Sequence, residues 1–113
     1  MYANSVRENS LQFETIRKFY VLVDTYFKEK KQVQEYADML NKSPKTLANI
    51  LSAYQQPSAI RIIHNRIQAE ARRLLLYTAK SSKEIALMLG FEDQAAFSRF
   101  FKNATEYRHQ YKK

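Results

Sequence analysis

Apolar residues recur every three or four positions along much of this chain, which is the spacing of one face of an α-helix. The pattern is clearest in two stretches, about 11–28 and about 58–77. Gly and Pro are rare, and no run of alternating polarity indicates a strand. The chain is therefore predicted to be all-α. The expected apolar stripes are Phe13, Ile16, Tyr20, Val23 and Phe27 in the first stretch, and Ile60, Ile63, Ile67, Ala71 and Leu74 in the second.

Capping residues mark the starts of three more helices. Ser43 is a good N-cap and Pro44 a favoured first helical residue, so one helix is expected to begin there. Ser81 and Glu84, three positions apart, have the spacing of a capping box. Asp93 is an N-cap for a further helix. The chain is therefore predicted to alternate long helices with short, well-capped ones.

One arrangement, a short helix followed by a tight turn and a capped helix, occurs twice in the sequence. Residues 36–40 (YADML) resemble residues 85–89 (IALML) at an offset of 49 positions. Past the turn the offset becomes 50, so the second turn holds one extra residue. The matching apolar anchors beyond the turns are Leu47 with Phe97, and Ile50 with Phe100.

Each copy has the residue types that a helix-turn-helix requires. Ala37 and Ala86 are small enough to let the second helix cross closely over the first. Asn41 and Gly90 occupy the turns, where a residue that tolerates a positive φ is needed. Side chains between the anchors must then face outward, and in a helix-turn-helix that outward face enters the major groove of DNA.

Composition indicates a class of partner and excludes several kinds of chemistry. Nineteen Lys and Arg against eleven Asp and Glu give a net charge of +8, which suits a polyanion such as nucleic acid. With no cysteine and only two histidines, no metal site or cofactor is expected. No nucleophile–base arrangement or phosphate-binding loop is apparent, so the protein is not expected to be an enzyme.

A membrane is the weaker explanation of the positive charge. No stretch approaches the roughly 20 apolar residues of a transmembrane helix, and the first ten residues lack the apolar run of a signal peptide. The basic face of the 58–77 helix is interrupted by Gln68 and Glu70, and Trp is absent. We therefore expect a cytoplasmic protein without membrane contact.

Four segments together form a specific family signature: ARRLL at 71–75, KEIA at 83–86, GFED at 90–93 and FSRFFK at 97–102. With these segments, the chain resembles the DNA-binding domain of the AraC/XylS family of bacterial transcription regulators. The resemblance covers roughly residues 19–111.

This resemblance implies a domain of about seven helices over residues 11–113, following a loose segment or linker remnant at 1–10. Family members place two recognition helices in successive major grooves of double-stranded DNA, about 34 Å apart. The resemblance therefore implies sequence-specific binding at promoters and regulation of transcription. The expected parts are a first helix-turn-helix at about 33–52, a linker helix at about 58–77 and a second helix-turn-helix at about 82–103.

Family members usually carry a separate sensing or dimerising domain, most often before this one. The chain is accordingly expected to be either a fragment of a larger regulator or a small single-domain member. Activators of the family also touch RNA polymerase, which is a further candidate partner.

Position in the family pattern assigns the residues that face DNA. The base-facing candidates are Lys45, Ala48 and Asn49 in the first recognition helix, and Gln94, Ala95, Ser98 and Arg99 in the second. The phosphate candidates are Ser43, Arg66, Arg72, Arg73 and Lys102.

These candidates differ in what their chemistry allows. Gln94 and Asn49 can make two hydrogen bonds to adenine, although Asn49 is also compatible with a purely solvated role. Lys45 suits a guanine or a phosphate equally, and a phosphate or structural role is preferred over base contact for Arg99. The two alanines can only touch a thymine methyl group or make room. Gln94 is the strongest candidate, because recognition helices use their N-terminal residues.

The end of the chain departs from the family pattern. Glu106 stands where members usually have glycine, and the proline that follows in them is absent. The closing helix is therefore expected to be either continuous with the preceding one or displaced. This departure, with Ala48 and Ala95 on the recognition faces, leaves a second hypothesis open. In it, the chain is a helical protein-interaction module that has kept the scaffold but lost specific DNA reading.

Overall fold

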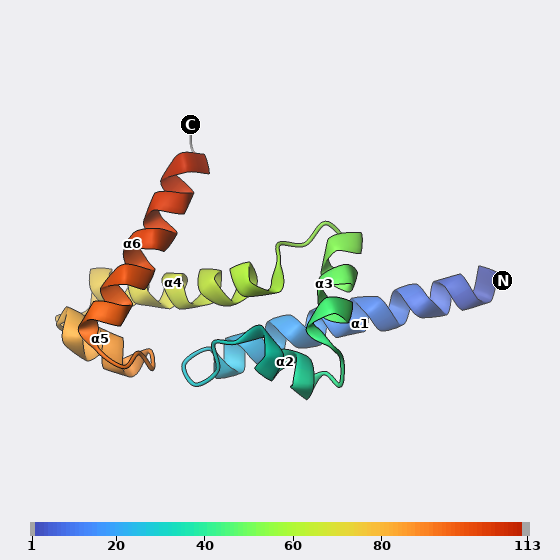
Figure 1. The fold of residues 1–113 in the computed structure, drawn as a ribbon, viewed down its shortest axis with the longest axis horizontal. Helices are drawn as coiled ribbons and strands as arrows, with labels where there is room; N and C mark the ends of the chain where they lie inside the picture. Colours follow the sequence, from blue (N-terminus) through green and yellow to red (C-terminus); the bar gives the residue numbers. More distant parts are fainter. Residues whose placement is uncertain (1, 112–113) are drawn as a thin grey trace. The chain divides into compact units, whose positions relative to one another are not determined.

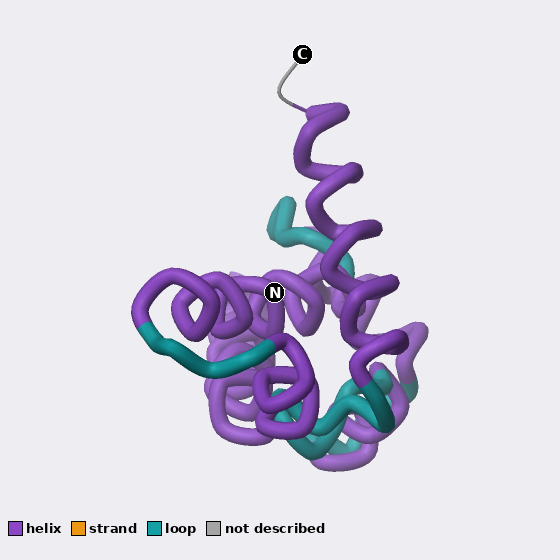
Figure 2. Tube along the Cα trace, turned by 90° about the vertical axis from the view of Figure 1, so that its left-hand side faces the viewer, coloured by secondary structure: helices purple, strands orange, loops and turns teal. Residues whose placement is uncertain are grey.

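The computed structural model describes residues 2–111, with side chains over residues 9–103. Within that range the protein consists of α-helices joined by loops and contains no strand, so the all-α prediction is confirmed (Figures 1 and 2). No helix in the described part of the chain is both long enough and apolar enough to cross a lipid bilayer. The helices are α1 (Tyr2–Tyr26), α2 (Val33–Met39), α3 (Pro44–Ala53), α4 (Ala59–Tyr77), α5 (Ser82–Met88) and α6 (Gln94–Tyr111).

The chain divides into two compact units, Met1–Ile63 and His64–Lys113. The first unit contains α1, α2, α3 and the start of α4, and the second contains the rest of α4 with α5 and α6. Helices α2 and α3 contact each other and also contact α1, and α5 contacts α6. Each unit therefore contains one short helix that is followed, across a tight turn, by a helix that packs against it.

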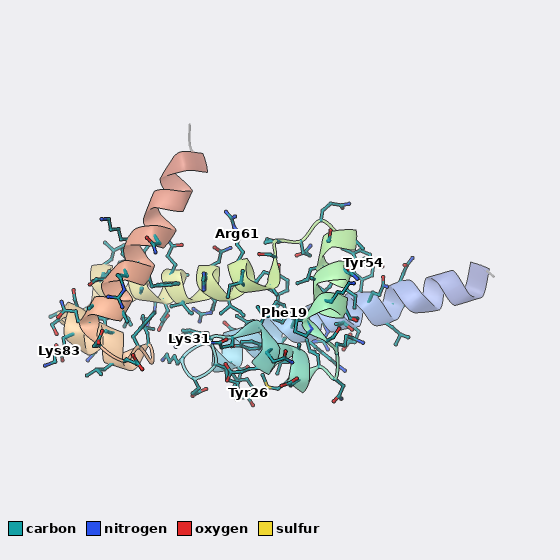
Figure 3. The ribbon with its side chains drawn as sticks, viewed as in Figure 1. Phe19, Tyr26, Lys31, Tyr54, Arg61 and Lys83 are labelled. Carbon is teal, nitrogen blue, oxygen red and sulfur yellow. The ribbon has the colours of Figure 1, made fainter. Side chains whose placement is uncertain are left out.

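The core of the first unit forms where α1 meets α2 and α3. Phe19, labelled in Figure 3, is fully buried. Its ring meets that of Tyr36 edge-on, with the ring centroids 5.8 Å apart. The stripe predicted on α1 is only partly right, because Phe13 and Tyr20 are exposed. Both lie at the edge of the core. The ring centroid of Phe13 is 4.4 Å from that of Tyr54, and the Tyr20 hydroxyl donates a 2.7 Å hydrogen bond to Gln56 Oε1. In the part of α1 whose side chains are described, the buried residues are Thr15, Ile16, Phe19 and Val23, and Phe27, directly after the helix, is also buried.

Helix α1 begins at Tyr2, although residues 1–10 were expected to be loose and the helix was expected to start near Leu11. Residues 2–10 contain neither glycine nor proline, so nothing in them stops a helix that forms further along the chain. Polarity alone was therefore a poor guide to where this helix starts.

The core of the second unit is formed by α4, α5 and the first half of α6. In α4 the predicted face is largely buried, except that Ile60, in the part of α4 that belongs to the first unit, is exposed. Helix α6 runs without a break to Tyr111, so the expected closing helix is continuous with the second recognition helix. No glycine or proline follows residue 93 to end it. The buried apolar residues are Ile67, Ala71, Leu74, Ile85, Ala86, Leu89 and Phe97.

Three helices end in the same hydrogen-bonded motif, in which one residue adopts a left-handed backbone. Its φ is 55° at Asn41, after α2, and 82° at Gly90, after α5, as predicted. Gln55, after α3, has a φ of 54° and was not predicted. The backbone bonds that close these turns run from Lys42 N–H to the Ala37 carbonyl (3.0 Å), from Gln56 N–H to Leu51 (2.9 Å) and from Phe91 N–H to Ala86 (2.9 Å).

Candidate nucleic-acid interface

Helix α3 is built as an amphipathic helix with a capped start. Ser43 Oγ accepts a hydrogen bond from Thr46 N–H at 3.0 Å, and Pro44 is the first helical residue. Its buried side consists of Leu47, Ile50 and Leu51. Its exposed side includes the three predicted base-facing residues, Lys45, Ala48 and Asn49.

Helix α6 repeats this construction in the second unit. The Asp93 carboxylate caps it, accepting a hydrogen bond from Ala96 N–H at 2.8 Å. Phe97 is buried, and its ring lies 5.4 Å from that of Phe91 and 5.8 Å from that of Phe101. The four predicted base-facing residues, Gln94, Ala95, Ser98 and Arg99, are all exposed.

The helices that precede α3 and α6 explain why the outward faces are held in place. Ala37 in α2 and Ala86 in α5 are both completely buried, which allows close helix crossing. The capping box at the start of α5 forms as expected, with Ser81 Oγ accepting the Glu84 N–H and the Glu84 carboxylate accepting the Ser81 N–H. These hydrogen bonds lower the pKa of Glu84, so that this carboxylate stays ionised. Caps and core packing therefore hold α3 and α6, the two helices that carry the outward faces, in place.

The cations of the linker helix are not equally available to DNA. Glu70 is held between two of them: its carboxylate lies 3.8 Å from Arg66 and accepts two hydrogen bonds from Arg73, at 2.8 and 3.0 Å. These hydrogen bonds raise the pKa of Arg73 above its already high ordinary value. Arg72 is half-buried and Lys102 is exposed. Two of the five phosphate candidates therefore share one carboxylate.

Two polar residues of α4, Gln68 and His64, lie at least partly within the interior of the second unit. Gln68 is buried, with 6% of its surface exposed, so it does not interrupt an exposed basic face. Its side-chain nitrogen has no hydrogen-bond partner within the described part of the chain. His64 is half-buried with its ring edge-on to Phe100 at 5.1 Å, and burial lowers its pKa. Both residues thus belong with the interior of the second unit more than with a DNA-facing surface.

An open hollow of about 390 Å³ lies between α1 and α3, on the flank of the first recognition helix. The predicted base-facing residue Asn49 forms part of its wall, together with Lys42 and Thr46, which the sequence analysis did not select. The one signal in the sequence was the internal repeat, which aligns Lys42 with an aromatic residue, Phe91. The lining residues are Leu11, Gln12, Thr15, Lys42, Thr46, Asn49 and Ile50.

Comparison with known proteins matches the two pairs of helices, α2 with α3 and α5 with α6, to a known family. A family model described as a helix-turn-helix domain matches residues 36–108, which is more than half of the chain. The match begins in α2, ends in α6 and so includes both left-handed turns and both predicted recognition helices, α3 and α6. No curated protein and no solved structure matches the chain.

Proposed function

Because this chain belongs to the AraC/XylS family of DNA-binding transcription regulators, we propose that it recognises a specific double-stranded DNA sequence with both recognition helices. In this proposal, α3 and α6 enter successive major grooves at a promoter. The protein acts by binding DNA and catalyses no reaction. The protein acts in the cytoplasm, on the nucleoid.

The observation that carries this proposal is the equivalence of two lobes, the helix pair α2–α3 and the helix pair α5–α6. Each has a fully buried alanine, a left-handed turn residue and a side-chain cap before the second helix. In each, the second helix buries one side and exposes the other. This repeated geometry is what a reader with two helix-turn-helix motifs requires, and it supports the proposal.

The exposed residues divide into readers and positioners. Gln94, the first residue of α6, and Asn49 of α3 are proposed to contact base edges. Arg99, also exposed on α6, is proposed to contact a phosphate in preference to a base. Ala95 and Ala48 leave room for a thymine methyl group, while Lys45 and Ser98 lie on the same faces and contact bases or phosphates.

The phosphate contacts are proposed to come from a smaller set than five. Arg72 and Lys102 are the main ones. Arg66 and Arg73 contribute less, because Glu70 offsets part of their charge. Ser43 contributes as a cap, since its hydroxyl already bonds both the backbone and the side chain of Thr46.

Selection of random duplex DNA on the purified protein, at two salt concentrations, tests the proposal. An enriched motif with two contacted segments one helical turn apart is the expected result. Salt-sensitive binding without an enriched motif would mean that the net charge of +8 alone attracts DNA. The interaction-module hypothesis would then be preferred. Under either outcome, RNA polymerase and a sensing domain are proposed partners to be tested by co-purification.

A further inference from the structure

We propose that the hollow between α1 and α3 binds a phosphate of the DNA backbone, with Lys42 supplying the positive charge and α1 acting as a third DNA-contacting element. This inference rests on the proposed function, because it assumes that α3 lies in the major groove. It adds residues that neither the family pattern nor the charge of the chain singled out.

Three of the lining residues, Gln12, Lys42 and Thr46, bring hydrogen-bond donors to the hollow for which residues 9–103 supply no acceptor. No carboxylate within residues 9–103 forms an ion pair with Lys42. Thr46 Oγ1 accepts the Ser43 hydroxyl proton at 2.9 Å, which leaves its own proton to donate. The Tyr54 hydroxyl shares its one proton between two oxygens, Asn9 Oδ1 at 2.9 Å and Gln12 Oε1 at 3.0 Å, which leaves the amide N–H groups of Gln12 to donate. Together, an ammonium, a hydroxyl and an amide suit an anion.

The position of the hollow matches the wall of a DNA groove. A helix with its side chains is about 10–12 Å across, and the major groove is about 12 Å wide, so a recognition helix fills it. Whatever lies on the flank of that helix then meets the sugar-phosphate backbone. Asn49 belongs both to the exposed face of α3 and to the wall of the hollow, so the two surfaces are continuous. Helix α1 brings Gln12 to this flank.

The second lobe shows what this position does when it has no such role. The residue equivalent to Lys42 is Phe91, which follows the left-handed residue in the same hydrogen-bonded turn. Its ring packs against Phe97 and Phe100, at 5.4 Å from each. An apolar residue here commonly stabilises such a turn. The first lobe instead carries Lys42 beside an open hollow. The turn therefore lacks the apolar packing that Phe91 provides in the second lobe, and a positive charge lies next to α3.

The test measures the salt dependence of binding to the selected DNA site for the full chain and its variants. Lys42→Gln is expected to reduce the slope of log K against log[salt] by about 0.9, the value for one lost phosphate contact. It should weaken binding to all sequences alike, and Lys42→Arg should preserve most of the slope. Lys28→Gln is the matched control: Lys28 is an exposed lysine outside the hollow, so its slope should stay near that of the wild type.

Two further variants separate binding from folding and test the role of α1. Lys42→Phe places the aromatic residue of the second lobe in the first, so its urea midpoint should equal or exceed that of the wild type. Its slope of log K against log[salt] should nevertheless fall by the same amount as in Lys42→Gln. Gln12→Ala should weaken binding several-fold without changing the slope, because an amide carries no charge.

The outcomes distinguish this inference from the function on which it rests. If the wild-type chain selects no DNA sequence, the proposed function fails. If it selects one and Lys42→Gln keeps the same slope as Lys28→Gln, the phosphate site is wrong while the function stands. If Lys42 affects the slope but Gln12→Ala changes nothing, α1 is not part of the interface.

Discussion

Left-handed turn residues show how much a single backbone position contributes. Gly90 adopts its φ of 82° without a steric penalty, whereas Gln55 must hold 54° with a side chain. Gly90→Ala is therefore expected to destabilise the protein by about 1 kcal/mol, and Gln55→Gly to stabilise it by up to about 1 kcal/mol. Urea denaturation followed by circular dichroism measures both. Ala48→Gly, in the interior of α3, is the control and should destabilise by about 1 kcal/mol. A destabilised Gln55→Gly would contradict the argument.

Gln68 presents the opposite problem, a polar side chain where an apolar one would fit. Its amide nitrogen is buried without a partner in the described part of the chain. Because an unsatisfied buried donor costs roughly 1–3 kcal/mol, Gln68→Met should raise the free energy of unfolding by about 1 kcal/mol. A loss of stability in this variant would show that the amide has a partner, such as a bound water.

His64 should make the second unit sensitive to mild acid. Burial lowers its pKa below the ordinary 6.5, so between that value and its folded pKa the unfolded chain binds more protons than the folded one. Stability contributed by the neutral ring is thus complete above about pH 6.5 and is lost as the pH falls. The melting temperature of the wild type should drop more between pH 7.5 and pH 5 than that of His64→Gln. Equal drops would rule out this histidine as the cause.

Among the elements, α2 depends on one hydroxyl group. Tyr36 is completely buried, and its hydroxyl donates a 2.6 Å hydrogen bond to the carbonyl of Lys30. Burial raises the pKa of Tyr36 to about 12, so the donor stays protonated well above neutral pH. Tyr36→Phe should cost about 1 kcal/mol by leaving that carbonyl without its partner. Tyr77→Phe, at a highly exposed position, should leave the urea midpoint unchanged.

Sequence patterns predicted the elements better than their edges. Caps and turns depend on short-range chemistry, so Ser43, Ser81, Asp93 and Gly90 could be assigned from residue type alone. The start of α1 could not be, because a polar stretch without helix breakers can be helix or coil. The hollow was also not foreseen. It depends on how α1 packs against α3, which the spacing of residues within one helix does not contain.

At the scale of the whole molecule, DNA recognition is expected to depend on both lobes. Gln94→Ala should weaken binding to the selected site by about 1–3 kcal/mol and relax the preference at one base position. Arg72→Ala and Arg99→Ala should instead weaken binding to all sequences by a similar factor. Competition assays with single-base variants of the site distinguish the two patterns. Unchanged binding by Gln94→Ala would mean that α6 does not read bases through this side chain.

The exposed alanines at positions 48 and 95 have a consequence for how this protein can evolve. Each lies among polar residues on the outward face of a recognition helix and contributes nothing to the core. Replacing either with glutamine or arginine changes helix propensity by only a few tenths of a kcal/mol and leaves the packing intact. Under the proposed function, a lineage carrying this scaffold can therefore acquire a preference for a new DNA sequence by one substitution at a time, without first having to regain stability.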